Sequence, residues 1–235
     1  FEVSKGFSAR FSDRLNGRVM RLLISPLLRA MEDWDGFPST LGSLQNFRYP
    51  ISGEVCLHRR VVREIRFPSD WGVETGMMSD VFRLCAPHRV CQVDIAETYD
   101  HKHQDLSEKD PLGGLNKMAC DVTLCLLRTI SAGSTIPVSI DAKKLVPNYL
   151  RVAREMMRFY AADARINLLQ YDYALEDQTA TMFASAIDRA ISIFSNTPCQ
   201  PPGAPEWREI EDRLSGTASA IAEAVRLDAD QADRV

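Results

Sequence analysis

Two sequence runs, WGVETG (71–76) and DHKHQ (100–104), carry most of the information about the fold of this chain. The first run is typical of a turn that leads into a helix over about residues 72–84, with Glu74 in the first helical turn. Apolar side chains recur loosely at alternate positions over 89–95, which predicts a mostly buried strand. The second run follows that strand and carries two histidines and an aspartate. A helix followed by a buried strand indicates an α/β fold.

The other predicted elements place strands early in the chain and almost only helices after residue 106. In order they are a strand at 1–7, a helix from Gly17 through Leu28 that Pro26 kinks or divides, a loop at 33–50, a helix after Gly53, helices at 112–130, 148–169 and 173–194, a linker at 198–205 and a helix at 206–227. We therefore expect an α/β part over residues 1–106 and a mostly helical region over 107–235. The α/β part has too few strands to complete a doubly wound sheet, so a further segment is expected to cover or complete it.

The composition argues against several classes of protein. The net charge is −4 and the sequence pI is about 5.6, so we expect no general surface for nucleic acid. No apolar run approaches the roughly 18–20 residues that cross a bilayer, so no membrane segment is expected. Six cysteines without a Cys-x-x-Cys pair predict reduced, buried thiols in a cytoplasmic protein. Phe1 is not a start methionine and no signal peptide follows it, which is typical of a fragment or a cleaved product.

Three groups of side chains could carry chemistry. Arg18 follows Gly17 at a helix start, where free amides and a guanidinium can bind a phosphate or carboxylate. The alternative is a solvated arginine on an amphipathic helix. Glu74 either caps its helix or acts on a reacting group. In an extended segment His101 and His103 share one face, which suits a divalent metal or a phosphate; the alternative is a surface loop.

Four segments together resemble a known family. GRV at 17–19, SGE at 52–54, GVETG at 72–76 and residues 93–104, in this order and at these separations, resemble the glucosyl-3-phosphoglycerate synthases. The resemblance covers roughly residues 1–125. It implies the C-terminal part of a GT-A fold, the fold of nucleotide-diphospho-sugar transferases, followed by a mostly helical region. The donor-binding N-terminal half of such an enzyme would then lie outside this chain.

The resemblance also implies roles for individual residues on the acceptor side. Gly17 and Arg18 would bind the acceptor, together with Met20, which stands where the family carries a threonine and so replaces a hydroxyl by a thioether. His103 would be a further contact to the acceptor. Glu74 would be the catalytic carboxylate that orients the acceptor hydroxyl or the sugar, or takes up a proton.

The same resemblance implies a metal ion. His101 would hold Mg²⁺ or Mn²⁺ together with an Asp-x-Asp motif, which is expected upstream of Phe1. Two Asp-x-Asp runs do occur in the chain, at 33–35 and 228–230. Neither is predicted to end a strand, so neither is expected to be this motif.

The function that the resemblance implies is the retaining transfer of a hexose, glucose above all, by a metal-dependent hexosyltransferase. The donor would be a nucleotide diphosphate sugar, and the acceptor a small anion such as 3-phosphoglycerate or glycerate. A homodimer formed through the helical part is also implied. Two alternatives remain: a non-catalytic helical binding or assembly module derived from such an enzyme, and a metal-dependent hydrolase that uses Asp94, Asp100, His101 and His103.

Overall fold

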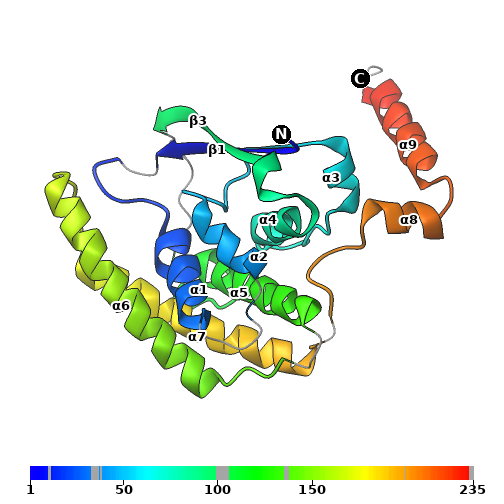
Figure 1. Cartoon of the computed structure of the whole chain (residues 1–235). Helices are drawn as coiled ribbons and strands as arrows, with labels where there is room; N and C mark the ends of the chain where they lie inside the picture. Colours follow the sequence, from blue (N-terminus) through cyan, green and yellow to red (C-terminus); the bar gives the residue numbers. More distant parts are fainter. Residues whose placement is uncertain are drawn as a thin grey trace.

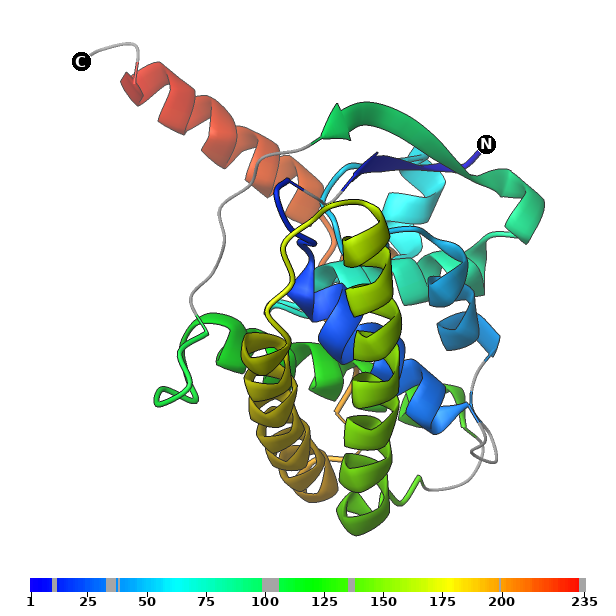
Figure 2. The same ribbon diagram turned by 90° about the vertical axis from the view of Figure 1, so that its left-hand side faces the viewer.

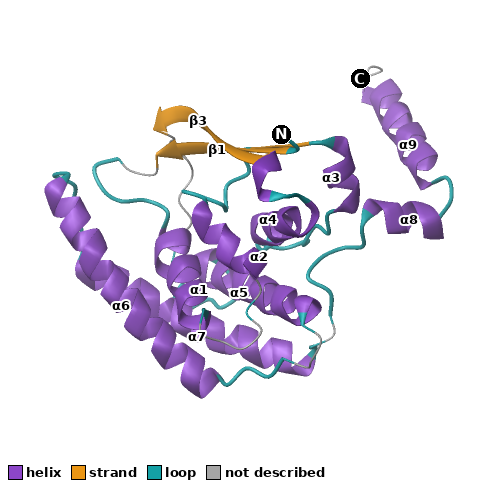
Figure 3. Ribbon diagram, in the orientation of Figure 1, coloured by secondary structure: helices purple, strands orange, loops and turns teal. Residues whose placement is uncertain are grey.

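A computed structural model of the chain describes residues 1–9, 12–32, 37, 39–98, 106–134, 138–198 and 200–232. Most of these residues are helical, and Figure 3 shows the few strands gathered on one side. The elements in chain order are β1 (Val3–Ala9), the π-helix η1 (Val19–Ile24), α1 (Ser25–Met31), α2 (Ser39–Gly42), the 3₁₀-helix η2 (Ser43–Asn46), β2 (Val55–Leu57), α3 (Arg59–Glu64), α4 (Val73–Leu84), the 3₁₀-helix η3 (Pro87–Arg89), β3 (Val90–Thr98), α5 (Gly114–Gly133), α6 (Ala142–Ile166), α7 (Tyr173–Asn196), α8 (Trp207–Arg213) and α9 (Thr217–Ala232).

The strands form a small mixed sheet with β1 in the middle. Within the described ranges the order is β2-β1-β3. β2 pairs with β1 in antiparallel register, with Lys5 opposite Val55. β3 runs parallel to β1, with Val3 opposite Val90 and a shifted register after Phe7. The parallel pair confirms the predicted α/β character, and the sheet of the described residues has three strands. The GT-A assignment stays a prediction, because a sheet this small is compatible with many folds.

The helices cover one side of the sheet, and β3 lies at its edge (Figure 1). Val93 is 44% exposed and Ile95 is 52% exposed. The prediction of a mostly buried strand over residues 89–95 is therefore wrong in its burial, although the strand itself is confirmed. The apolar alternation at these positions leaves large side chains on a surface that the described elements do not cover.

Three other predicted elements differ from the structure. The helix expected after Gly53 is preceded by a strand, β2, because Val55 lies opposite Lys5 in the sheet. The loop expected at 33–50 contains α2 and η2. The last helix is divided into α8 and α9 at Gly216, whose φ of +88° is a left-handed conformation that glycine adopts without strain. α9 extends away from the other helices (Figure 2).

Proline has different effects in the two helices that contain it. Pro26 lies in the first turn of α1, where its missing N–H costs nothing, and the helix changes there from the π-helix η1 to an α-helix. The predicted division at Pro26 is therefore confirmed. Pro147, which we expected to interrupt the head of a helix, lies inside α6.

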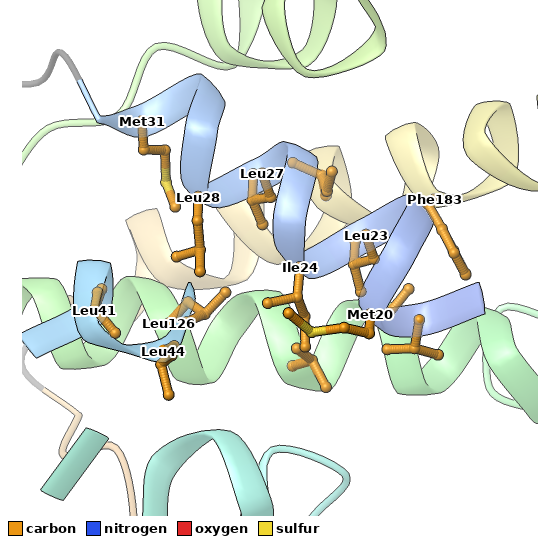
Figure 4. Packing of buried hydrophobic residues seen from close by; sticks show 14 of the residues in the cluster. Met20, Leu23, Ile24, Leu27, Leu28, Met31, Leu41, Leu44, Leu126 and Phe183 are labelled. Carbon is orange, nitrogen blue, oxygen red and sulfur yellow. The ribbon is translucent and has the colours of Figure 1, made fainter. Parts of the chain in front are cut away.

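A single cluster of buried apolar residues joins the two parts that we expected to meet at residue 106. The π-helix η1 and α1 contribute Met20, Leu23, Ile24 and Leu27, and they pack against side chains of α5 and α7 such as Leu126 and Phe183 (Figure 4). The separation into domains at 1–106 and 107–235 stays a prediction, but the two parts share this core.

Three of the cysteines are buried as expected, whereas Cys56 is exposed and Cys91 is partly buried, so the prediction of buried thiols is wrong for Cys56. Cys85, Cys120 and Cys125 are free thiols enclosed by the fold. Burial raises the pKa of the Cys125 thiol to about 12, so this sulfur is protonated and acts as a small apolar group. Cys199 lies outside the described residues. None of the described helices combines the length and apolar character that a membrane crossing requires.

Two glycines let α4 lie close to α5. A Cβ atom at Gly72 would be 2.6 Å from Cβ of Cys125, and one at Gly76 would be 2.5 Å from Cγ of Pro68 and 3.1 Å from Sγ of Cys125. Asp70 accepts a hydrogen bond from the Gly72 amide at 2.8 Å, which fixes the turn before the helix. The GVETG run is therefore required by packing, and this packing sets where the first turn of α4 lies.

We expect Gly76→Ala to lower the free energy of unfolding by about 1–3 kcal/mol, because the added methyl group overlaps a proline ring and a buried sulfur. Gly53→Ala is the matched control, since a Cβ at Gly53 would meet nothing within 4 Å. Urea unfolding of both variants measures the difference. Equal stability of the two variants would contradict the close approach of α4 to α5.

Candidate functional site

Gly17 fixes the start of the helix that carries Arg18. Its φ is +73°, and a Cβ at this position would lie 2.8 Å from Cε2 of Tyr49. A side chain would be strained in this backbone conformation and would also collide with the tyrosine ring. Glycine is therefore required for the chain to turn tightly into η1 beside the loop that contains Tyr49.

Arg18 is partly buried and only weakly paired. Its Nε lies 3.8 Å from Glu176 of α7, and 27% of its side chain is exposed. Arg21 is the main partner of that carboxylate, with hydrogen bonds of 2.6 and 3.0 Å. The pair between Arg21 and Glu176 holds η1 on α7, while the long distance to Arg18 leaves most of its guanidinium donors available to an anion. The acceptor role of Arg18 stays a prediction.

Met20 lies in the hydrophobic core that Figure 4 shows. Its thioether packs among apolar side chains, and it places no hydrogen-bonding group next to Arg18. The predicted contact between Met20 and an acceptor stays untested.

Lys5 is a buried charge that the sequence analysis missed. It is 1% exposed, and its Nζ donates hydrogen bonds to Oγ of Ser52, to the Gly6 carbonyl at 3.1 Å and to the Glu54 carbonyl at 3.3 Å. A buried ammonium must be satisfied in this way, because removal from water is costly. The signal that could have revealed it is a lysine in the middle of the apolar strand at 1–7.

Glu74 lies in the first turn of α4 and is half-buried. Burial raises the pKa of its carboxyl group above the ordinary value of 4.5, and the charge of Glu54 raises it further, whereas a backbone hydrogen bond and the charge of Lys5 lower it. The charges of Glu54 and Lys5 therefore act on Glu74 in opposite directions. A carboxyl group in this state is a better proton acceptor near neutral pH than an exposed one.

The structure links two of the four sequence motifs through Lys5, and a third motif lies beside the loop that precedes one of them. Gly17 touches Tyr49, which lies three residues before Ser52. Ser52 accepts a hydrogen bond from Lys5, and the charge of Lys5 acts on Glu74. The fourth motif contains His101 and His103, and both lie outside the described residues.

An open hollow of about 400 Å³ lies at the carboxyl end of the parallel strands β1 and β3. The guanidinium of Arg48 lies 3.8 Å above the ring of Phe7 and forms an ion pair with Asp94. Crevices at the carboxyl ends of parallel strands are where α/β folds bind their ligands. The chain reaches residues 99–105, with His101 and His103, directly after β3.

A metal site is not formed by the described residues alone. Within the ranges that the structure covers, no group of three or more histidine, cysteine, aspartate or glutamate side chains could hold an ion. The metal role of His101 stays a prediction.

The raised pKa of Glu74 predicts how stability depends on pH. The folded state binds this proton more tightly than the unfolded state, so the contribution of Glu74 is most favourable below pH 4.5 and is lost as pH rises through the folded pKa. Glu74→Gln removes that loss. We expect the variant to match the wild type in acid and to unfold at higher urea concentration at pH 7. A wild type that gains stability relative to the variant between pH 4.5 and pH 7 would contradict the burial of this carboxyl group.

Comparison with known proteins identifies relatives of the chain. A glucosyl-3-phosphoglycerate synthase from Persephonella marina is 35% identical over 228 residues, which are 97% of this chain and 56% of that protein. A protein of the same name from Methanococcoides burtonii is 32% identical over 202 residues, 84% of this chain and 49% of that protein. No protein-family model matches the sequence, and no solved structure does.

The chain spans about half the length of the curated relatives that it matches. The matched region contains all four motifs in the order that the sequence analysis describes, because it extends over nearly the whole chain. This chain is therefore a homologue of the glucosyl-3-phosphoglycerate synthases, as its sequence motifs predict.

Proposed function

We propose that the protein transfers glucose from a nucleotide diphosphate sugar to a small anionic acceptor such as 3-phosphoglycerate or glycerate, with retention of anomeric configuration. The observation that carries this proposal is the similarity, over 97% of the chain, to a protein named glucosyl-3-phosphoglycerate synthase. The available guanidinium donors of Arg18 and the raised pKa of the Glu74 carboxyl group are compatible with it. The alternative of a non-catalytic module has no comparable support.

Arg18 anchors the acceptor in this proposal. Its guanidinium is 3.8 Å from the nearest carboxylate and keeps donors for the paired oxygens of a phosphate or carboxylate group. An anion bound there would leave its hydroxyl group free to point toward the sugar.

Glu74 orients the hydroxyl group that attacks. In the transfer, the acceptor oxygen forms a bond to the anomeric carbon, and the bond from that carbon to the diphosphate oxygen breaks. For retention without a protein nucleophile, attack and departure occur on the same face, and the hydroxyl proton passes to the leaving diphosphate. Lys5 keeps the Ser52–Glu54 segment in place and acts on the charge of Glu74, so it is a positioning residue.

The proposal includes a divalent ion, Mg²⁺ or Mn²⁺, with His101 as one ligand. When bound, such an ion neutralises the diphosphate that departs. His103 is proposed as a contact to the acceptor. A homodimer and a cytoplasmic location complete the proposal.

The test is a transfer assay with the full-length gene product, Mg²⁺ or Mn²⁺, and UDP-glucose, GDP-glucose or GDP-mannose against 3-phosphoglycerate and glycerate. We expect Arg18→Ala to raise the KM for the acceptor by about tenfold to a hundredfold, because it removes charge-assisted hydrogen bonds of about 1.5–3 kcal/mol. His101→Ala should lower kcat for every pair of substrates. Arg151→Ala, on the exposed face of α6, is the matched control and should leave both parameters unchanged.

Two results would contradict the proposal. Absence of both transfer and donor hydrolysis with every pair of substrates would favour the non-catalytic module. A glycosyl group attached covalently to Glu74, detected by mass spectrometry, would exclude attack and departure on the same face.

A further inference from the structure

A second hollow lies between α3 and α8, away from the candidate site. Its volume is about 390 Å³, and arginine dominates its lining. The lining residues are His58, Arg59, Arg60, Arg63, Glu64 and Arg208. We name this feature the α3–α8 pocket. Such a concentration of arginine is unexpected in a chain with a net charge of −4.

The acidic residues around the pocket do not fully neutralise its arginines. Arg60 pairs with Glu2 at 2.7 Å, and Arg63 pairs with Glu211. Glu64 is shared, at 3.4 Å from Arg60 and at 3.7 Å from Arg208.

Arg59 makes no ion pair with any residue in the part of the chain that the structure describes. It nevertheless lines the pocket together with Arg208 of α8. Arg59 and Arg208 are therefore the two guanidinium groups, one on each wall, with most of their donors available.

His58 adds a further donor at the rim. Its Nδ1 accepts a hydrogen bond from the Arg60 amide at 3.2 Å, so the neutral ring carries its proton on Nε2. Nε2 is then a donor, like every guanidinium N–H in the pocket. A site lined by donors and positive charge, with arginine rather than lysine, fits the paired oxygens of phosphate groups.

The α3–α8 pocket is at the opposite end of β1 from the candidate site. Glu2, which pairs with Arg60, precedes β1, and its carbonyl accepts a hydrogen bond from the His58 amide at 2.8 Å. The hollow with Phe7 and Ala9 is at the carboxyl end of the same strand. At about 3.3 Å per residue, the two ends are roughly 20 Å apart. A ligand of the α3–α8 pocket is therefore distinct from one bound in the hollow beside Phe7 and Ala9.

We propose that the α3–α8 pocket binds a small molecule with more than one phosphate group, which bridges α3 and α8. Arg59 and Arg208 supply the contacts, one from each wall. The pocket is also connected to α4, because Arg83 donates hydrogen bonds to the Glu64 carbonyl at 3.1 Å, to Glu206 at 3.0 Å and to Asp80 at 2.9 Å. A ligand that draws α8 toward α3 therefore acts on the helix that carries Glu74.

Inorganic pyrophosphate is the probe that tests this site. Calorimetric titration of the 235-residue chain at constant low ionic strength should show saturable binding, because screening of these exposed charges is then small. Arg59→Gln combined with Arg208→Gln should weaken the affinity at least about tenfold, since each substitution removes charge-assisted hydrogen bonds. Hydrogen exchange should show that pyrophosphate slows exchange of α8 amides in the wild type and not in the double variant.

Two matched variants locate the binding. Arg151→Gln combined with Arg158→Gln removes two arginines from another arginine-lined hollow, on α6, and should leave the affinity unchanged. Arg18→Gln should also leave it unchanged, and this separates the inference from the proposed acceptor site. The proposal is overturned by absence of saturable binding, by an unchanged affinity in the double variant at Arg59 and Arg208, or by equal loss in either control.

Discussion

The ammonium group of Lys5 is the buried charge on which the rest of the candidate site depends. It lies in the middle strand of the sheet, where a cation without partners would cost several kcal/mol. Its hydrogen bonds to Ser52 and to the Glu54 carbonyl fix the segment before β2 against β1. The same charge acts on Glu74 from across the site. Two segments that are distant in the sequence are therefore held together by one side chain, and its charge also lowers the pKa of the Glu74 carboxyl group.

Glycines supply the second constraint, because they set how closely the segments approach. Gly17 allows η1 to begin beside Tyr49, and Gly72 and Gly76 allow α4 to lie against Cys125. A Cβ atom would lie 2.8 Å from Tyr49 at Gly17, 2.6 Å from Cys125 at Gly72 and 3.1 Å from Cys125 at Gly76. The glycines of the GRV and GVETG runs are thus explained by packing, and the polar residues beside them, Arg18 and Glu74, are placed by that packing.

The sequence predicts those parts of the fold that depend on local pattern. α4, α5 and α7 were found because their apolar periodicity is bounded by glycine, proline or polar turns. β2 was missed because a strand of three residues exists only through its pairing with β1, which local pattern does not contain. The burial of β3 was wrong because apolar alternation does not tell which face the helices cover.

Local sequence pattern likewise reveals some residues of the candidate site and not others. Gly17, Arg18 and Glu74 stand in recognisable runs, whereas Lys5 is a single lysine whose importance comes only from its burial beside Ser52. Arg18 was expected either to bind an anion or to be a solvated arginine on a helix. In the structure its guanidinium is partly buried beside Glu176 rather than fully solvated. Nothing in the described ranges bears on His101 and His103.

The most direct test of this account is a double-mutant cycle between Lys5 and Glu74, read from urea unfolding at pH 7. The variants are Lys5→Met, Glu74→Gln and the two substitutions combined. The account predicts that Lys5→Met costs about 1–3 kcal/mol more when the Glu74 carboxyl group is present than when Glu74→Gln has replaced it. Additive effects of the two substitutions, within about 0.5 kcal/mol, would show that Lys5 does not act on Glu74 and would contradict the account.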